Sequence, residues 1–145
     1  MQLIILLFSM YVFVVQIYSK DSNEHFIINN NFTADKINKS LIGSIARGRK
    51  VFSSRKVNCL SCHQVPTKAK FQGNIGPSLE GIGSIYKRNE LRLRVINSKL
   101  INPNTIMPAY FVNIQYPRTP SNLFNKTILT AQEVEDIVEY LYSLK

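Results

Sequence analysis

Cys59-Leu60-Ser61-Cys62-His63 is the stretch that decides how this chain folds. Two thiols three positions apart, followed at once by an imidazole, form the Cys-x-x-Cys-His pattern at which a c-type haem is attached. The thiols can add to the two vinyl groups of one porphyrin, and His63 then stands ready to bind the iron. The pattern predicts one covalent haem c, held by Cys59 and Cys62 and ligated by His63.

Four other interpretations of this stretch stay open: a redox dithiol, a zinc site, a structural disulfide and coincidence. A structural zinc needs about four ligands. Besides Cys59, Cys62 and His63, the chain contains only one further cysteine or histidine, the remote His25. A thioredoxin-like dithiol should lie in a βαβ context, which the surrounding sequence does not show. A Cys59–Cys62 disulfide would close too short a loop to add much stability.

The first nineteen residues, Met1 to Ser19, contain no charged side chain and include two apolar runs. Such a segment is typical of a secretory signal, although the basic residues that usually precede the apolar run are missing. A retained membrane anchor is the alternative, but the run is short for a full span. We expect residues 1–19 to be a signal peptide, 20–39 a polar lead and 40–145 one domain.

Charge is distributed unevenly along the chain. Between Lys36 and Lys126 there are sixteen lysines and arginines against only Glu80 and Glu90, whereas acidic residues predominate from Thr130 onward. A basic surface can bind nucleic acid, but in an exported protein it more often attracts acidic proteins or anionic substrates. We therefore expect no nucleic-acid partner, and ordinary solvated lysines are the simpler alternative for any single charge.

Two segments before and after the motif are predicted to be helices. Ser40–Ser53 spaces its apolar residues at a helical period; its Gly48 would let another helix approach closely, and Phe52 would cover an edge of the haem. Asn89–Asn97 is interpreted as a helix with Arg92 and Arg94 facing outward, although its alternation of Leu and Arg also fits a strand.

The C-terminal segment gives the strongest helix signal. Thr130 and Glu133 match a capping box, and acidic residues near a helix start suit its positive end. An apolar stripe then follows at helical spacing, formed by Val134, Ile137, Val138, Leu141 and Leu144. This stripe should pack against the first helix near Gly48.

Two loops are expected to complete an iron site. Gln64–Gly83 is rich in Gly and Pro, and the carbonyl of Pro77 is a candidate acceptor for the second ring N–H of His63, which would fix the imidazole tautomer. Leu79 would pack on the haem face. That Pro77 merely shapes a turn is the alternative.

Met107 is the only methionine outside the predicted signal peptide, and it lies in the proline-bounded loop from Ile101 to Pro108. A single methionine usually fills a core, but this place in an irregular loop favours a sixth iron ligand, with His25 as the competitor. The segment Ala109–Leu129 is long and irregular, and its aromatic residues are expected to cover the haem or face a partner.

The order of these features resembles that of class I cytochromes c over about residues 41–145. Within that class, several strings resemble the X subunits (SoxX) of the Sox thiosulfate-oxidising systems: Phe71–Leu79, Leu91–Val95, Ile101–Pro103, Thr105–Tyr110 and Leu129–Asp136. The resemblance implies an all-α class I cytochrome c fold, a single haem-binding domain of about four short helices and long loops. The sequence of Phe111–Phe124 departs from the family pattern, as does the uncharged start of the signal segment.

The same resemblance implies a periplasmic electron-transfer subunit with His63 and Met107 as iron ligands. In that family a larger SoxA-type cytochrome is the heterodimer partner, and the pair oxidatively joins thiosulfate to a carrier-protein cysteine, an L-cysteine S-thiosulfotransferase activity. The sulfur chemistry belongs to the partner's haem, so no catalytic residue is expected here, and electrons leave to a downstream acceptor. Membrane contact is expected only through the signal segment. Alternatives are a free soluble carrier delivering electrons to an oxidase, and an enzyme with an open distal site.

Overall fold

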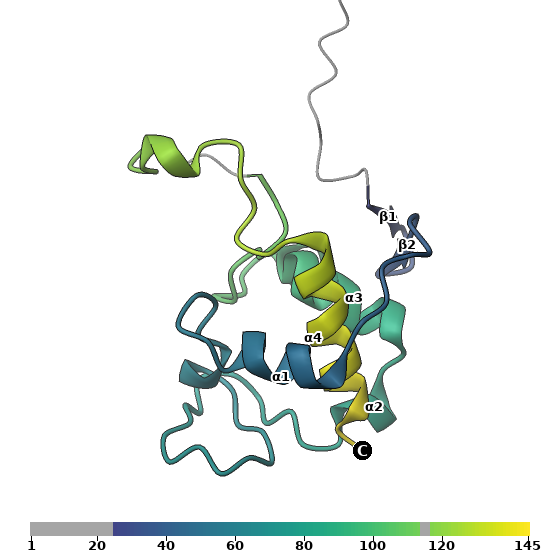
Figure 1. Ribbon diagram of the computed structural model, residues 1–145, viewed down its shortest axis with the longest axis vertical. Helices are drawn as coiled ribbons and strands as arrows, with labels where there is room; N and C mark the ends of the chain where they lie inside the picture. The colour runs from purple at the N-terminus through teal and green to yellow at the C-terminus, as the bar shows by residue number, and fades with distance from the viewer. Residues whose placement is uncertain (1–24, 114–116) are drawn as a thin grey trace, which may run out of the picture.

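The computed structural model describes residues 25–113 and 117–145. Within these ranges a β-hairpin and four α-helices follow one another, joined by long loops and three short 3-10 turns. The C-terminal helix α4 is central, because α1, α2 and α3 all contact it, and Figure 1 shows α1 crossing it. The predicted signal peptide lies outside the described residues, and no helix inside them has the length and apolar character to cross a membrane.

Helix α4 spans Ala131–Ser143 and begins at the predicted capping box. The Thr130 hydroxyl accepts from the Glu133 N–H at 3.2 Å, and the Glu133 carboxylate accepts from the Thr130 N–H at 2.8 Å. The predicted stripe, Val134, Ile137, Val138, Leu141 and Leu144, is buried in the core. Both predictions for this helix are confirmed.

Helix α1 spans Ile45–Phe52, so it begins five residues later than predicted, after Ser44 in extended conformation caps it. A Cβ added to Gly48 would clash with the carbonyl oxygen of Asp136. The two backbones therefore touch here, which confirms the predicted packing of α1 on α4. Phe52 packs edge-on against Tyr140, with 5.5 Å between ring centroids, and its contact with a haem edge stays a prediction.

Helix α3 spans Arg88–Asn97 and follows the single turn of α2, Ile82–Ile85. The helical interpretation of this segment is confirmed, but the outward placement of Arg92 was wrong, since only 5% of that residue is exposed. Its guanidinium donates to both carboxylate oxygens of Glu135 and, at 2.7 Å, to the carbonyl of Ala34. An arginine can be buried in this way because its planar fork meets a carboxylate in two parallel hydrogen bonds.

The segment expected to be a polar lead contains a β-hairpin. β1 (Phe26–Asn29) pairs antiparallel with β2 (Thr33–Lys36), Phe26 opposite Lys36, and β2 packs on α3. Phe26 and Ala34 are buried, so the hairpin belongs to the core. The all-α expectation is therefore corrected, because the fold contains a two-stranded sheet besides its helices and loops. Strands of four residues with one or two buried positions leave too little alternation for a sequence pattern to reveal.

Candidate haem site

The Cys-x-x-Cys-His stretch forms a tight turn after α1. Asn58 adopts the left-handed conformation, with φ of 53°, and the 3-10 turn Cys59–Ser61 follows it. The Cys62 and His63 N–H groups both donate to the carbonyl of Cys59, at 3.1 and 3.0 Å. In a 3-10 turn, residues three apart face the same side, so the turn suits two thiols that must reach one porphyrin edge.

His63 is oriented by the loop that follows it. Its Nδ1 lies 2.8 Å from the carbonyl oxygen of Pro77, and because a carbonyl only accepts, Nδ1 carries the proton. Nε2 therefore keeps its lone pair for a metal. Gly76 allows this approach, since a Cβ there would lie 2.5 Å from His63 Cε1. The Gly76 N–H also donates to the carbonyl of Cys62 at 2.8 Å, which holds loop and motif together.

The surroundings of Cys59 do not favour the thiolate that a redox dithiol would need. Both cysteines are free, and burial is the main reason that the pKa of Cys59 is raised to about 12. Thiol exchange needs the thiolate, which this environment disfavours. Nor does any cluster of three or more His, Cys, Asp or Glu able to hold a metal ion occur in residues 25–113 and 117–145.

Met107 lies in the predicted irregular loop, after α3 and a 3-10 turn at Ser98–Leu100. Its side chain is half-buried against the core. Its N–H donates to the Thr105 hydroxyl at 3.2 Å, and its carbonyl accepts from the Ser98 hydroxyl at 3.4 Å. The thioether is thus on the inner side of a loop that continues directly to Tyr110.

Tyr110 connects the methionine loop to the haem motif, a role that sequence reasoning missed. Its hydroxyl donates to the carbonyl of Val57, two residues before Cys59, at 3.1 Å. Tyr110 and Phe111 are buried in the core, which contradicts a partner-facing position for these two residues, while their covering of the haem stays a prediction. The only sequence signal was an aromatic residue three positions after Met107.

These residues fit a covalent haem. Two thiols on one turn, an imidazole with Nε2 left for a metal, and the half-buried Met107 three residues before Tyr110 supply the donor set of a His/Met cytochrome. Large apolar side chains next to both candidate ligands are open to solvent: Ile75 is 67% and Ile106 77% exposed. Leu79, in the same loop as Gly76 and Pro77, is half-buried against the core.

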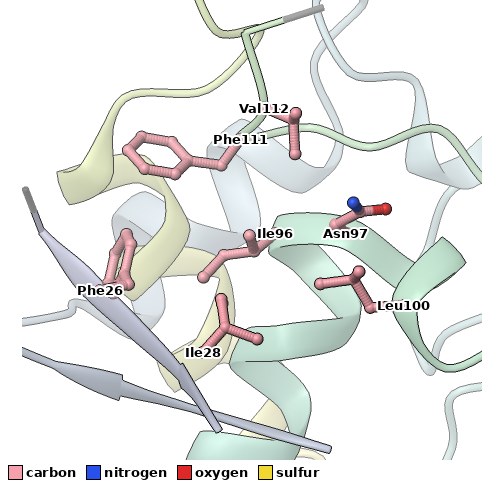
Figure 2. A pocket seen from close by; sticks show the side chains of 7 residues that line it. All are labelled: Phe26, Ile28, Ile96, Asn97, Leu100, Phe111 and Val112. Atoms are coloured by element: carbon pink, nitrogen blue, oxygen red, sulfur yellow. The ribbon is translucent and has the colours of Figure 1, made fainter. Parts of the chain in front are cut away.

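An apolar cavity of about 180 Å³, whose lining includes neither cysteine, lies between the hairpin and the end of α3 (Figure 2). Its walls include Phe26 and Ile28 of β1, Ile96 and Leu100, and Phe111 and Val112. None of the residues lining it is a cysteine, histidine or methionine. His25 packs edge-on against Phe26 and Phe111, at 6.4 and 6.3 Å between ring centroids, which is the environment of a structural aromatic ring.

Comparison with known proteins gives a family and a structural relative. The family model described as "Cytochrome c" matches residues 45–145. A chain of the crystal structure of SoxXA from P. pantotrophus superposes with a TM-score of 0.72 at 27% sequence identity, covering 82% of this chain and 94% of that one. No curated protein matches significantly. The family match spans all the elements that position Cys59, His63 and Met107, and we conclude that the chain belongs to the cytochrome c family, with the class I layout and a likeness to SoxX.

Proposed function

We propose that the chain is an exported cytochrome with one covalent haem c, working as the electron-transfer subunit of a SoxAX-type complex. Cys59 and Cys62 would hold the haem, and His63 and Met107 would be its axial ligands, with Pro77 orienting His63 and Leu79 lying against the haem face. When bound, the haem supplies one-electron storage. The observation that carries the proposal is the hydrogen bond from His63 Nδ1 to Pro77, which leaves Nε2 for iron.

The likeness to a SoxXA chain supports the choice of partner and reaction. The partner would be a larger SoxA-type cytochrome, and the pair would join thiosulfate to a carrier-protein cysteine. Forming a sulfur–sulfur bond from a thiol and thiosulfate releases one proton and two electrons, so the reaction class needs an electron acceptor. His/Met ligation raises the reduction potential of a haem, which suits an acceptor that hands electrons onward.

The haem assignment is tested on a denaturing gel. Wild-type protein, produced with a c-type haem attachment system and stained for haem peroxidase activity, should keep its haem through denaturation. The Cys59→Ala/Cys62→Ala double variant should lose it. A wild-type chain that carries no retained haem would remove the basis of the proposal.

Ligation by Met107 is tested on the ferric protein. Met107→Ala should abolish the long-wavelength charge-transfer band of a sulfur–iron(III) bond and lower the reduction potential, because a soft thioether favours ferrous iron. Leu100→Ala, at an exposed apolar position after α3, is the control and should leave both unchanged. An unchanged band in Met107→Ala would point instead to an open or differently ligated haem, as in an enzyme with a free distal site.

Partnership is tested by co-expression with a SoxA-type subunit and size-exclusion chromatography. A stable one-to-one complex that reduces this chain's haem when thiosulfate and carrier protein are added supports the proposal. A chain that stays monomeric and exchanges electrons with an oxidase would favour the free soluble carrier.

A further inference from the structure

Hydrogen bonds of Tyr110 and of the N–H that follows it connect this residue to three separate parts of the fold. Its carbonyl accepts from the Leu129 N–H at 2.9 Å, immediately before the cap of α4, and the next N–H, of Phe111, donates to the carbonyl of Ile96 in α3 at 3.1 Å. The Tyr110 hydroxyl reaches the third part, the Val57 carbonyl before the haem motif. Only 8% of the residue is exposed, so these bonds are shielded from water.

The main chain of Met107 itself has weaker attachments, although Lys99 donates to the carbonyl of Thr105 at 2.8 Å earlier in the same loop. The bonds of the Met107 main chain to Thr105 and Ser98 are 3.2 and 3.4 Å long, at or beyond the usual range. Ile106 on one side is 77% exposed, and Pro108 on the other is exposed as well. The firm attachment nearest to Met107 on its C-terminal side is therefore Tyr110.

We propose that Tyr110 is a positioning residue for the sixth iron ligand: its hydroxyl, bound to the Val57 carbonyl, holds the Met107 loop against the haem-attachment turn and so keeps the thioether on the iron. The inference rests on the proposed haem function. It adds that a hydrogen bond between two loops controls how firmly Met107 is held on the iron. Neither the donor nor the acceptor of that hydrogen bond touches the iron.

Removing this donor should let the loop open more often. Tyr110→Phe keeps the buried ring and deletes the hydrogen bond to Val57, together with the contact of the hydroxyl to Cys59. One hydrogen bond of ordinary net strength corresponds to roughly a fivefold change in an equilibrium constant. An external ligand that competes with Met107 binds only the open form, so its apparent affinity reports the open fraction.

The experiment is a titration of the ferric holoprotein with imidazole, followed by absorption. Tyr110→Phe should bind imidazole about fivefold more tightly than wild type. Tyr140→Phe, at an equally buried tyrosine of α4, should match wild type. Met107→Ala should bind imidazole more tightly still, and adding Tyr110→Phe to it should change nothing, because the loop then has no ligand to hold.

Replacing Tyr110 by 3-fluorotyrosine distinguishes an effect of the hydrogen bond from a general disturbance of folding, because it keeps the ring and makes the hydroxyl a stronger donor. Imidazole should then bind more weakly than to wild type. The inference is overturned if Tyr110→Phe binds imidazole no more tightly than wild type, even if its thermal stability falls. It is also overturned if the 3-fluorotyrosine protein binds imidazole as tightly as wild type or more tightly. A wild-type chain without covalent haem overturns the proposed function instead, and this inference with it.

Discussion

The orientation of His63 depends on a residue without a side chain. Gly76 lies against the imidazole face, and its neighbour Pro77 presents the carbonyl that accepts from Nδ1. Hydrogen-bonded partners of this kind fix the tautomer and orientation of a ligating histidine. The chain thus uses backbone atoms of one loop both to make room for the ring and to aim it.

Gly76→Ala tests this arrangement. The added methyl group would lie 2.5 Å from His63 Cε1, so the ring must rotate away from Pro77, and Nε2 would no longer be aimed to hold iron. We expect a lower yield of holoprotein and a ferric spectrum shifted toward the high-spin form. Ser78→Ala, an exposed change in the same loop, is the control, and an identical low-spin spectrum in both variants would contradict the prediction.

The pKa of the Asp136 carboxyl is determined by its neighbours. Burial alone would raise the pKa of this carboxyl, but hydrogen bonds from Arg47, Ser44 and Gln132 and the Arg47 charge outweigh it and lower the pKa. The stabilisation is therefore complete above the unfolded pKa of about 3.9 and is lost as pH falls through the lower folded value.

The free energy of unfolding should accordingly decline with acidification from about pH 4 downward. Asp136→Asn should make that decline shallower, as measured by urea unfolding at a series of acidic pH values. Glu80→Gln, at an exposed position, should keep the wild-type slope. A wild-type slope in Asp136→Asn would show that this carboxyl does not contribute to the acid sensitivity.

At the level of the elements, α3, α4 and the hairpin meet at one buried ion pair. Arg92 is 5% and Glu135 3% exposed, and the guanidinium also holds the Ala34 carbonyl of β2. Lys36 of the same strand lies 3.7 Å from the Glu135 carboxylate. Three elements far apart in sequence are thus joined by one side chain.

Arg92→Met should destabilise the fold by about 3 kcal/mol, because it leaves a buried carboxylate that Lys36 compensates only in part. The double variant Arg92→Met/Glu135→Leu should recover most of that loss in urea unfolding. Lys56→Ala, which breaks the exposed pair with Glu133, should cost less than about 1 kcal/mol. Equal losses in Arg92→Met and Lys56→Ala would mean that burial of the pair is unimportant.

This ion pair also shows where sequence reasoning ends. The capping box and apolar stripe of α4, the helix at α3 and the contact at Gly48 were predictable because each is a local pattern of residue type and spacing. Arg92 and Glu135 carry charges that local patterns assign to solvent, and only their meeting across 43 positions makes burial favourable. Tyr110 was missed for the same reason, since its partner Val57 is 53 residues away.

For the whole molecule, the basic character of the middle of the chain bears on association with a partner. Exposed cations there include Arg49, Lys50, Arg55, Lys68 and Lys70. Attraction between exposed charges is screened by salt, since the Debye length falls from about 30 Å at 0.01 M to about 3 Å at 1 M. Steered association is correspondingly sensitive to ionic strength.

We expect the association rate with an acidic partner to fall at least tenfold over roughly that range of salt. The dissociation rate should change much less and serves as an internal control. Both rates are measured by passing this protein over an immobilised partner. Lys68→Glu/Lys70→Glu should reproduce part of the loss at low salt. An association rate independent of salt would exclude a steering role for these exposed cations.

The hairpin lies wholly outside residues 45–145, the part that the family model matches, yet its Phe26 and Ala34 fill core positions. A protein trimmed to the recognisable cytochrome segment would strip the cover from α3. The side chains beneath, apolar Ile96 among them, would meet water, and the guanidinium of Arg92 would lose its carbonyl acceptor. Expression designs for this chain should therefore retain the residues from His25 onward, or aggregation of the shortened form will be mistaken for failure of haem loading.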